Sequence, residues 1–430
     1  MKIVIVGSGW AGCSAAYFAA REGAQVILLE KTDLLLGTGL VGGIMNNNGR
    51  RTASLEAAAL GIGELFGVIE SVTRHDNIDF PGHKHASLYD VERIEAAIKK
   101  FLNEAGVEIV FKALVNNADV TDSTINSVSY EIKDNSGTNI TVKVDGDVFI
   151  DTTGTAGPVG NCTKYGTGCA MCILRCPSFG PRISLAGLAG VSELKAKDGS
   201  RGFEAMSGSC KIDKRSLKKT LVKKLEEAGR LVIPLPEEFR KKDSLSKKAC
   251  QQYAIEEFAD NLIILDTGQA KLMTPYFPIE NLRQIEGFRE AKYADPYSGG
   301  KGNSVRFMAM SPCDGTMKVK GIHNLFCAGE KVGPIVGHTE AIITGALAGI
   351  NAVRAAKGRQ LHSLPSELAV GDIIEFMHGQ IESGEGIKNK YSFSGSVYFS
   401  RMLEKDLYST DKEVIEKRIK VLGITRLLSN

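Results

Sequence analysis

The sequence of 430 residues predicts an α/β fold in which both ends of the chain build one domain and the middle is inserted. The first thirty residues alternate strand, helix and strand around a glycine-rich turn. Residues 190–275 are more polar, and the strand–turn–helix pattern returns from residue 321. We therefore expect residues 1–160 and 321–360 to form one domain, 161–320 an inserted mixed α+β domain for substrate and redox chemistry, and 361–430 a helical C-terminal region.

The individual elements follow from the apolar pattern. Residues 2–6 read as a buried strand, 13–22 as an alanine-rich helix and 25–30 as a second strand. Residues 89–105 place apolar side chains on one side and predict an amphipathic helix. Residues 113–150 hold two alternating runs around a turn, which predicts antiparallel strands.

Composition narrows the class of protein. The net charge of +3 is too small to indicate nucleic-acid or membrane binding by itself. The longest apolar stretch, from residue 341, is too short and glycine-rich to span a bilayer, and Met1 leads directly into a strand, with no room for a signal peptide. Nine cysteines, clustered rather than spread, are typical of a reducing compartment, so we expect a cytoplasmic protein with no membrane partner.

The first glycine-rich turn is a dinucleotide fingerprint. Gly7, Gly9 and Gly12 form a G-x-G-x-x-G that follows a strand and opens a helix, and Glu30 ends the next strand. The first glycine allows the tight turn, the second lets the backbone approach a pyrophosphate, and the third permits close helix–strand packing. The phosphates would lie on the free N–H groups of the helix, and Glu30 would accept hydrogen bonds from a ribose. The pattern predicts a Rossmann-type domain.

A second segment indicates which dinucleotide binds. Residues 321–356 resemble the C-terminal flavin-binding segment of glutathione-reductase-like flavoproteins, and are most similar to the GidA-like family of FAD proteins. The resemblance rests on the runs 326–330 (FCAGE), 337–341 (GHTEA) and 348–352 (AGINA). It implies FAD, with the N-terminus of the following helix stabilising negative charge on the reduced flavin. Glu330 stands where the family has an amide, and His338 where it has a tyrosine.

Two further runs extend the resemblance. Residues 147–157 (DVFIDTTGTAG) resemble the family strand near the adenine half of FAD, and 38–47 resemble the loop along the pyrophosphate and ribityl chain. His338 is the candidate for proton transfer at the flavin. The chain shows no second fingerprint, so any NAD(P)H would bind transiently over the flavin. The expected cofactor-binding residues are Gly7, Gly9, Trp10, Ala11, Gly12, Glu30, Lys31, Gly42, Gly43, Thr153, Gly154, Gly329, Glu330, Glu340 and Ala341.

The run GCAMCILRCP, residues 168–177, holds three of four clustered cysteines. If the run is helical, Cys169, Cys172 and Cys176 share one face, and Cys162 lies upstream. The four thiolates are candidate ligands of an iron–sulfur cluster. Alternatively, Cys169 and Cys172 are a catalytic redox pair that exchanges electrons with the flavin. Packing and a structural zinc site are the other interpretations.

The main functional prediction is an FAD-dependent oxidoreductase that transfers electrons or a hydride at flavin N5. The cysteine segment would be its second redox centre, and a small molecule or a protein its redox partner. One alternative is a GidA-like enzyme that modifies uridine in RNA with a folate carbon. Residues 211–248 support it with thirteen Lys and Arg against six Asp and Glu, but they contain few aromatic residues for base stacking. The other alternative is a non-enzymatic electron-transfer flavoprotein for a protein partner.

Overall fold

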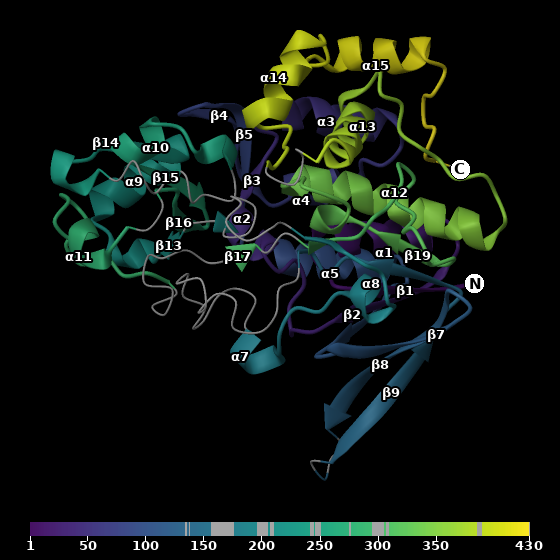
Figure 1. Cartoon of the computed structure of the whole chain (residues 1–430). Coiled ribbons are helices and arrows are strands. Elements are labelled where there is room, and N and C mark those ends of the chain that lie inside the picture. Colours follow the sequence, from purple (N-terminus) through teal and green to yellow (C-terminus); the bar gives the residue numbers. More distant parts are fainter. Residues whose placement is uncertain are drawn as a thin grey trace.

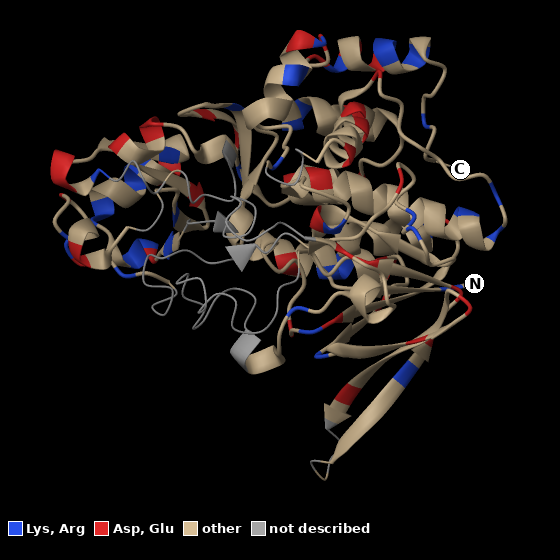
Figure 2. Ribbon diagram, in the orientation of Figure 1, with Lys and Arg blue, Asp and Glu red and all other residues tan. Residues whose placement is uncertain are grey.

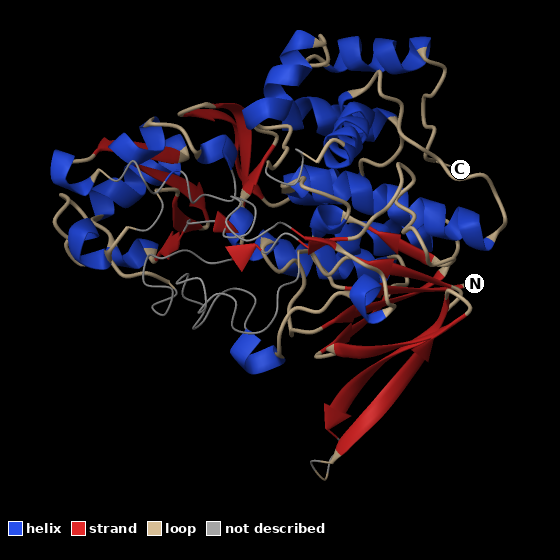
Figure 3. Ribbon diagram, in the orientation of Figure 1, coloured by secondary structure: helices blue, strands red, loops and turns tan. Residues whose placement is uncertain are grey.

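The structure is a computed structural model of the chain (Figure 1). Its five-stranded parallel sheet forms the centre of the larger domain, and helices cover it (Figure 3). The residues that the structure describes are 1–133, 136, 138–155, 176–195, 205–206, 210–240, 245, 251–274, 277–294, 305–306, 309–384 and 389–429.

The parallel sheet joins both ends of the chain, as predicted. Its strand order is β19-β10-β1-β2-β6, and every neighbouring pair is parallel. The strands are almost continuously apolar because helices cover the sheet. In order along the chain they are β1 (Lys2–Val6), β2 (Gln25–Glu30), β6 (Glu108–Phe111), β10 (Val148–Asp151) and β19 (Leu325–Cys327).

Two helices from opposite ends of the sequence cross on this sheet. Helix α1 (Trp10–Arg21) packs on α12 (His338–Ala356). A Cβ atom at Gly345 or Gly349 would overlap backbone carbonyl oxygens of α1, so these glycines let the two backbones approach closely. This contact places the N-terminal ends of both helices at one edge of the sheet.

A small antiparallel sheet, with order β3-β5-β4, precedes helix α5 (Ile94–Glu104). Its strands are β3 (Ile44–Met45), β4 (Thr73–Phe80) and β5 (His83–Tyr89). The expectation of a helix from residue 89 was wrong at its start, because Tyr89 ends β5 with its side chain buried. The chain turns at Asp90, whose carboxylate accepts the Glu92 N–H at 2.9 Å.

The predicted antiparallel meander is present and extends away from the parallel sheet (Figure 1). It consists of β7 (Val115–Thr121), β8 (Thr124–Lys133) and β9 (Asn139–Asp145), paired in sequence order. Short helix α8 (Leu185–Leu188) packs beside β7.

The described part of the inserted region contains a four-stranded antiparallel sheet with its own apolar core. The order is β13-β16-β15-β14, and helix α9 (Lys219–Ala228) packs on β14 and β15. A third apolar cluster joins β15 to strands β3, β4 and β5 and so connects the insertion to the larger domain. The strands are β13 (Cys210–Ile212), β14 (Arg230–Pro234), β15 (Asn261–Thr267) and β16 (Gln269–Leu272).

The C-terminal region is helical, as predicted. Helices α13 (Ala369–Glu382), α14 (Ser396–Glu404) and α15 (Lys412–Val421) gather on one side of the molecule, where α13 and α15 pack against α3 (Gly49–Ala59) (Figure 1). Buried Glu56 accepts the Ala369 and Val370 N–H groups at 3.1 and 3.0 Å, which satisfies free donors at the start of α13.

Candidate cofactor and substrate cleft

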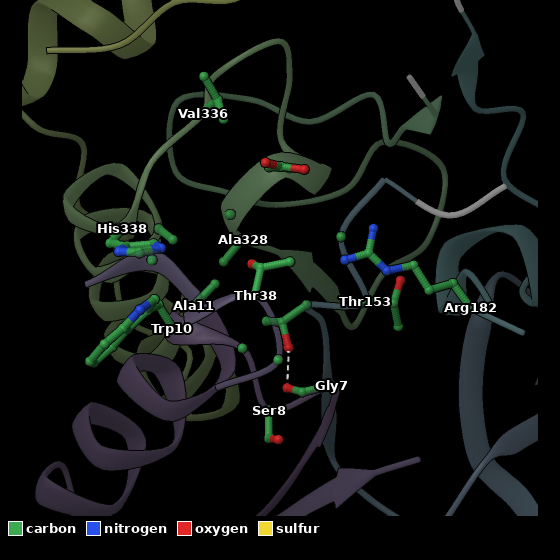
Figure 4. Close-up of a pocket in the computed structure, with 18 of the residues that line it drawn as sticks. Gly7, Ser8, Trp10, Ala11, Thr38, Thr153, Arg182, Ala328, Val336 and His338 are labelled. Carbon is green, nitrogen blue, oxygen red and sulfur yellow. Dashed lines mark hydrogen bonds between the residues drawn. The ribbon is translucent and has the colours of Figure 1, made fainter. Parts of the chain in front are cut away.

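One large cleft lies at the N-terminal ends of α1 and α12 (Figure 4). Residues of the inserted sheet also line it. Its empty volume is about 1580 Å³, open mouth included. The cleft is therefore lined by residues from both ends of the chain and from the inserted region.

The fingerprint forms the floor of the cleft. Gly7 has φ 99°, and a Cβ atom there would lie 2.7 Å from the Thr152 carbonyl oxygen. A Cβ atom at Gly12 would overlap the Gly7 carbonyl, so Gly12 serves helix–strand packing. Gly9 precedes α1, and a Cβ atom there would meet nothing within 4 Å. The start of α1 is therefore open to an approaching ligand.

Glu30 and Lys31 lie beside this floor, at the end of β2. The Glu30 carboxylate accepts the Ser8 N–H at 2.9 Å, the Ser8 hydroxyl at 2.7 Å and the Thr32 N–H at 2.8 Å. These bonds hold Glu30 at the edge of the cleft, where we predicted a ribose contact. The Lys31 ammonium donates to the Gly180 carbonyl oxygen at 3.0 Å, so it ties a neighbouring segment to the sheet.

The turn after β10 and the turn after β19 form an adjoining wall. Thr153 donates its hydroxyl to Asp151 at 2.7 Å, and Gly154 follows with φ 73°. Glu330 accepts the Thr155 hydroxyl at 3.2 Å, which links the two turns. Gly329 and Ala341 also line the cleft, so these small residues keep the backbone accessible there.

His338 is the first residue of α12 and lines the same cleft. Its ring packs against the rings of Trp10 and Tyr89, with centroid distances of 5.9 and 6.1 Å. The Tyr89 hydroxyl donates to the Gly39 carbonyl oxygen at 2.6 Å and lies 3.4 Å from His338 Nδ1. Burial raises the pKa of the Tyr89 phenol, which keeps it protonated. The packing therefore fixes the orientation of the imidazole at the helix terminus.

Three predicted cofactor residues do not line the cleft. Gly12 lies in the helix packing described above, and a Cβ atom at Gly43 would meet Thr267 at 2.6 Å or closer. Glu340 is buried and pairs with Arg50 at 3.2 Å. Glu340 also accepts the Phe393 N–H at 2.9 Å, so its carboxylate connects α12 to the C-terminal region.

The cysteine predictions fall mostly outside the described residues. Cys162, Cys169 and Cys172 lie there, and only the backbone of Cys176, at the start of helix α7 (Cys176–Phe179), is described. Among the described residues no group of three or more His, Cys, Asp and Glu side chains has a metal-binding arrangement. The iron–sulfur and redox-pair hypotheses therefore stay predictions.

Two other cysteines form a buried pair away from the cleft lining. The pKa of Cys313 is lowered to about 6, chiefly by a hydrogen bond with Cys327 and against the effect of burial, with a further contribution from His378. The Cys313 Sγ atom lies 3.8 Å from His378 Nε2. Neither Cys313 nor Cys327 contacts the cleft, so neither is placed to attack a ligand bound there.

The inserted region supplies further cleft residues that the sequence patterns did not indicate. Tyr253 packs against His83, with a centroid distance of 4.6 Å, and Lys271 on β16 donates to the Val41 carbonyl oxygen. The one local sign that Lys271 has a special role is its position between two apolar residues of β16. The lining residues from this region are Arg182, Ile183, Gln252, Tyr253, Lys271 and Met273.

The residues that are present fit FAD. The open start of α1 suits a pyrophosphate, the Glu30 carboxylate suits a ribose, and the start of α12 suits the electron-accepting ring. The cofactor-binding roles of the individual side chains remain predictions.

This fold and this cleft define a class: the chain is a GidA-like FAD-dependent oxidoreductase. Residues 2–158 match the family model described as FAD dependent oxidoreductase, and residues 211–360 match that of glucose inhibited division protein A. GidA of Aquifex aeolicus in its form II crystal superposes with a TM-score of 0.67 at 18% identity, over 100% of this chain and 74% of that one. The form I crystal gives a TM-score of 0.62 at 16% identity, over 100% and 76% of the two chains.

Curated relatives match shorter segments. The methylenetetrahydrofolate–tRNA-(uracil-5-)-methyltransferase TrmFO of Bacillus pumilus is 39% identical over 62 residues, 14% of each chain. The tRNA uridine 5-carboxymethylaminomethyl modification enzyme MnmG of Chlorobaculum tepidum is 35% identical over 122 residues, 28% of this chain and 19% of that one. The matched segments thus span less than a fifth of the length of these relatives.

Two surface properties bear on partners. Among the described helices, none has the length and apolar character needed to cross a membrane. In residues 211–240, the described stretch of the basic region, acidic side chains lie among the basic ones (Figure 2). Lys214 pairs with Asp266 at 2.5 Å and Lys218 with Glu286 at 3.3 Å, so part of the positive surplus is neutralised locally.

Proposed function

We propose that this protein is an FAD-dependent enzyme that adds a carbon to a uridine of RNA, with a folate-borne one-carbon unit as donor. The TrmFO and MnmG relatives, which are named as enzymes that modify uracil or uridine in tRNA, support this proposal. The match to the glucose inhibited division protein A model covers both the inserted sheet and the C-terminal flavin segment. This alternative is better supported than the prediction of a second, cysteine-based redox centre.

The observation that carries the proposal is the composition of the cleft. One end is the fingerprint, and the other end is a wall from the inserted region with an aromatic ring, an apolar side chain and a cation: Tyr253, Met273 and Lys271. Such a wall suits a planar heterocycle with polar edges. Lys271 would favour negative charge on a ring oxygen, and that charge makes the ring carbon a better nucleophile.

FAD, when bound, supplies hydride or electron transfer at its N5 atom. The start of α12 lines the cleft, and the positive end of its helix dipole favours negative charge there. His338 holds a proton at a ring nitrogen beside the same helix terminus, where it serves proton transfer. A reduced nicotinamide cofactor as the electron source is part of the proposal.

The proposal is tested on the product. FAD-loaded protein is incubated with unmodified tRNA transcript, methylenetetrahydrofolate and NADPH, and the nucleosides are analysed by mass spectrometry. With the wild type we expect a uridine whose mass has increased by a carbon substituent. In His338→Ala the rate of uridine modification should fall roughly 100-fold or more. His323→Ala, an exposed histidine in the turn before β19, is the matched control and should retain the rate. If the nucleosides stay unchanged after incubation with methylenetetrahydrofolate and NADPH, the proposal is contradicted.

The cysteine segment receives a separate test. Anaerobically purified protein is assayed for iron and acid-labile sulfide, and Cys169→Ser and Cys172→Ser are assayed for flavin reduction and turnover. Iron and sulfide in the protein support the cluster hypothesis. A loss of turnover without iron supports a thiol role. Full activity of both variants in iron-free protein removes both hypotheses.

A further inference from the structure

Arg182 brings a guanidinium group into the cleft from the inserted region. Its Nη1 atom donates to the Thr155 carbonyl oxygen at 3.2 Å. Its Nη2 atom lies 3.4 Å from the position that a Cβ atom of Gly154 would take, so the group covers the glycine turn after β10. Figure 4 shows the guanidinium directed past Thr153 toward the middle of the cleft.

The backbone on both sides of Arg182 is attached to the parallel sheet. On one side, the Gly180 carbonyl oxygen accepts the Lys31 ammonium at 3.0 Å. On the other side, the Ala186 N–H donates to the Asp151 carboxylate at 2.9 Å. Lys31 directly follows β2 and Asp151 ends β10, so the ends of two core strands hold the segment that carries Arg182. A side chain carried on a segment held in this way keeps its position in the cleft.

The wall opposite Arg182 already has anion-binding character. The open start of α1 at Gly9 presents backbone N–H groups to the same cleft. The two carboxylates in this part of the lining accept hydrogen bonds from the protein, Glu30 from Ser8 and Glu330 from Thr155. A guanidinium is planar and offers paired donors, which suit the oxygen atoms of a phosphate group.

We propose that Arg182 binds a phosphate group of FAD, as a cationic contact across the cleft from the fingerprint. The inserted region then takes part in holding the cofactor, although the fingerprint itself lies more than a hundred residues earlier in the chain. The proposal requires FAD as the cofactor and does not depend on the RNA chemistry proposed above.

The experiment compares ligands that contain the diphosphate with one that lacks it. Cofactor-free wild type, Arg182→Ala, Arg182→Lys and the exposed control Arg289→Ala are titrated with FAD, ADP and riboflavin by calorimetry or fluorescence. We expect Arg182→Ala to weaken FAD and ADP binding on the order of 10- to 100-fold, with Arg182→Lys intermediate and Arg289→Ala unchanged. Riboflavin affinity should be the same in all four proteins. The loss should shrink at high salt, because salt screens charge contacts.

Three results would overturn the proposal. FAD and ADP affinities of Arg182→Ala within twofold of wild type would show that Arg182 does not bind the cofactor phosphates. An equal loss for riboflavin would indicate a general disturbance of the cleft. A loss confined to binding of NADPH or of an RNA oligonucleotide to the FAD-loaded protein would assign Arg182 to a substrate phosphate instead. Far-UV circular dichroism of the cofactor-free variants verifies that each one is folded.

Discussion

At the residue scale, the absence of a Cβ atom at Gly42 leaves space for the His338 imidazole in the cleft. Gly42 lies in the short helix α2 (Gly39–Gly42), and a Cβ atom there would overlap the His338 imidazole. The backbone at Gly42 does not require glycine, because its φ is not positive. The glycine is therefore needed for the space that the imidazole occupies.

We predict that Gly42→Ala destabilises the protein by about 1–3 kcal/mol, the usual cost of overpacking. In the double variant Gly42→Ala/His338→Ala most of this cost should disappear, because the overlapping ring is absent. Urea unfolding of the four proteins of the cycle measures the coupling between the two positions. Gly67→Ala is the control, since a Cβ atom on that helical residue meets nothing within 4 Å. Strictly additive effects at Gly42 and His338 would contradict the prediction.

At the same scale, the sequence located several residues whose position depends on their near neighbours, while their roles in binding stay predictions. Gly7, Gly9, Glu30 and His338 line the cleft, and each of them lies at the end of a strand, directly after one or at the start of a helix. Glu340 does not face the cleft, because the distant residues Arg50 and Phe393 bind its carboxylate. Nothing in the sequence around Glu340 indicates these partners.

At the element scale, one buried carboxylate joins the inserted sheet to β4. Asp266 on β15 pairs with Lys214 at 2.5 Å, His75 at 2.9 Å and Arg74 at 3.2 Å. Burial acts to raise the pKa of Asp266, but hydrogen bonds from Lys214 and His75 and the charge of Arg74 outweigh it and hold the pKa below its usual value. The contact helps to set the position of the insertion beside the cleft.

We predict that Asp266→Asn lowers the free energy of unfolding at pH 7 by about 3–5 kcal/mol, because it removes the charge of the buried carboxylate that three basic side chains share. Since the folded pKa is lowered, this stabilisation is present above the unfolded pKa and is lost as the pH falls through the folded pKa. Acid titration of wild type should show that loss, and the variant should show less of it.

The control for this prediction is Asp119→Asn, which removes an exposed pair with Lys143 at 2.9 Å and should cost about 1 kcal/mol or less. Equal effects of the two substitutions in urea unfolding would mean that the Asp266 cluster is no stronger than a surface ion pair.

At the scale of the whole molecule, three regions far apart in sequence share one cleft. The N-terminal fingerprint, the inserted sheet and the start of α12 all line it. Helices α1 and α12 pack on each other beside it. A ligand that bridges these regions stabilises the whole folded chain, because it binds the folded state alone.

We predict that FAD at about 100 times its dissociation constant stabilises the cofactor-free protein by about 2.7 kcal/mol. FMN should stabilise it less, because FMN lacks the adenosine portion that the fingerprint and Glu30 are expected to hold. Thermal unfolding followed by circular dichroism, with each flavin at a matched concentration, measures the difference. Equal shifts for both flavins would contradict a dinucleotide site.

The sequence by itself determined the nucleotide-binding class, the parallel sheet built from both chain ends and the helical C-terminal region. These features depend on short-range physics: strand periodicity, the glycine requirement of a tight turn and the free N–H groups at a helix terminus. Only the tertiary structure decided which side chains face that site from the other side. Lys31 and Asp151 bind the segment that carries Arg182, and Tyr253 packs in the apolar cluster that joins β15 to β5. Lys271 is placed by the pairing of β16 with the distant strand β13. Such contacts leave no periodic signal in the neighbouring sequence.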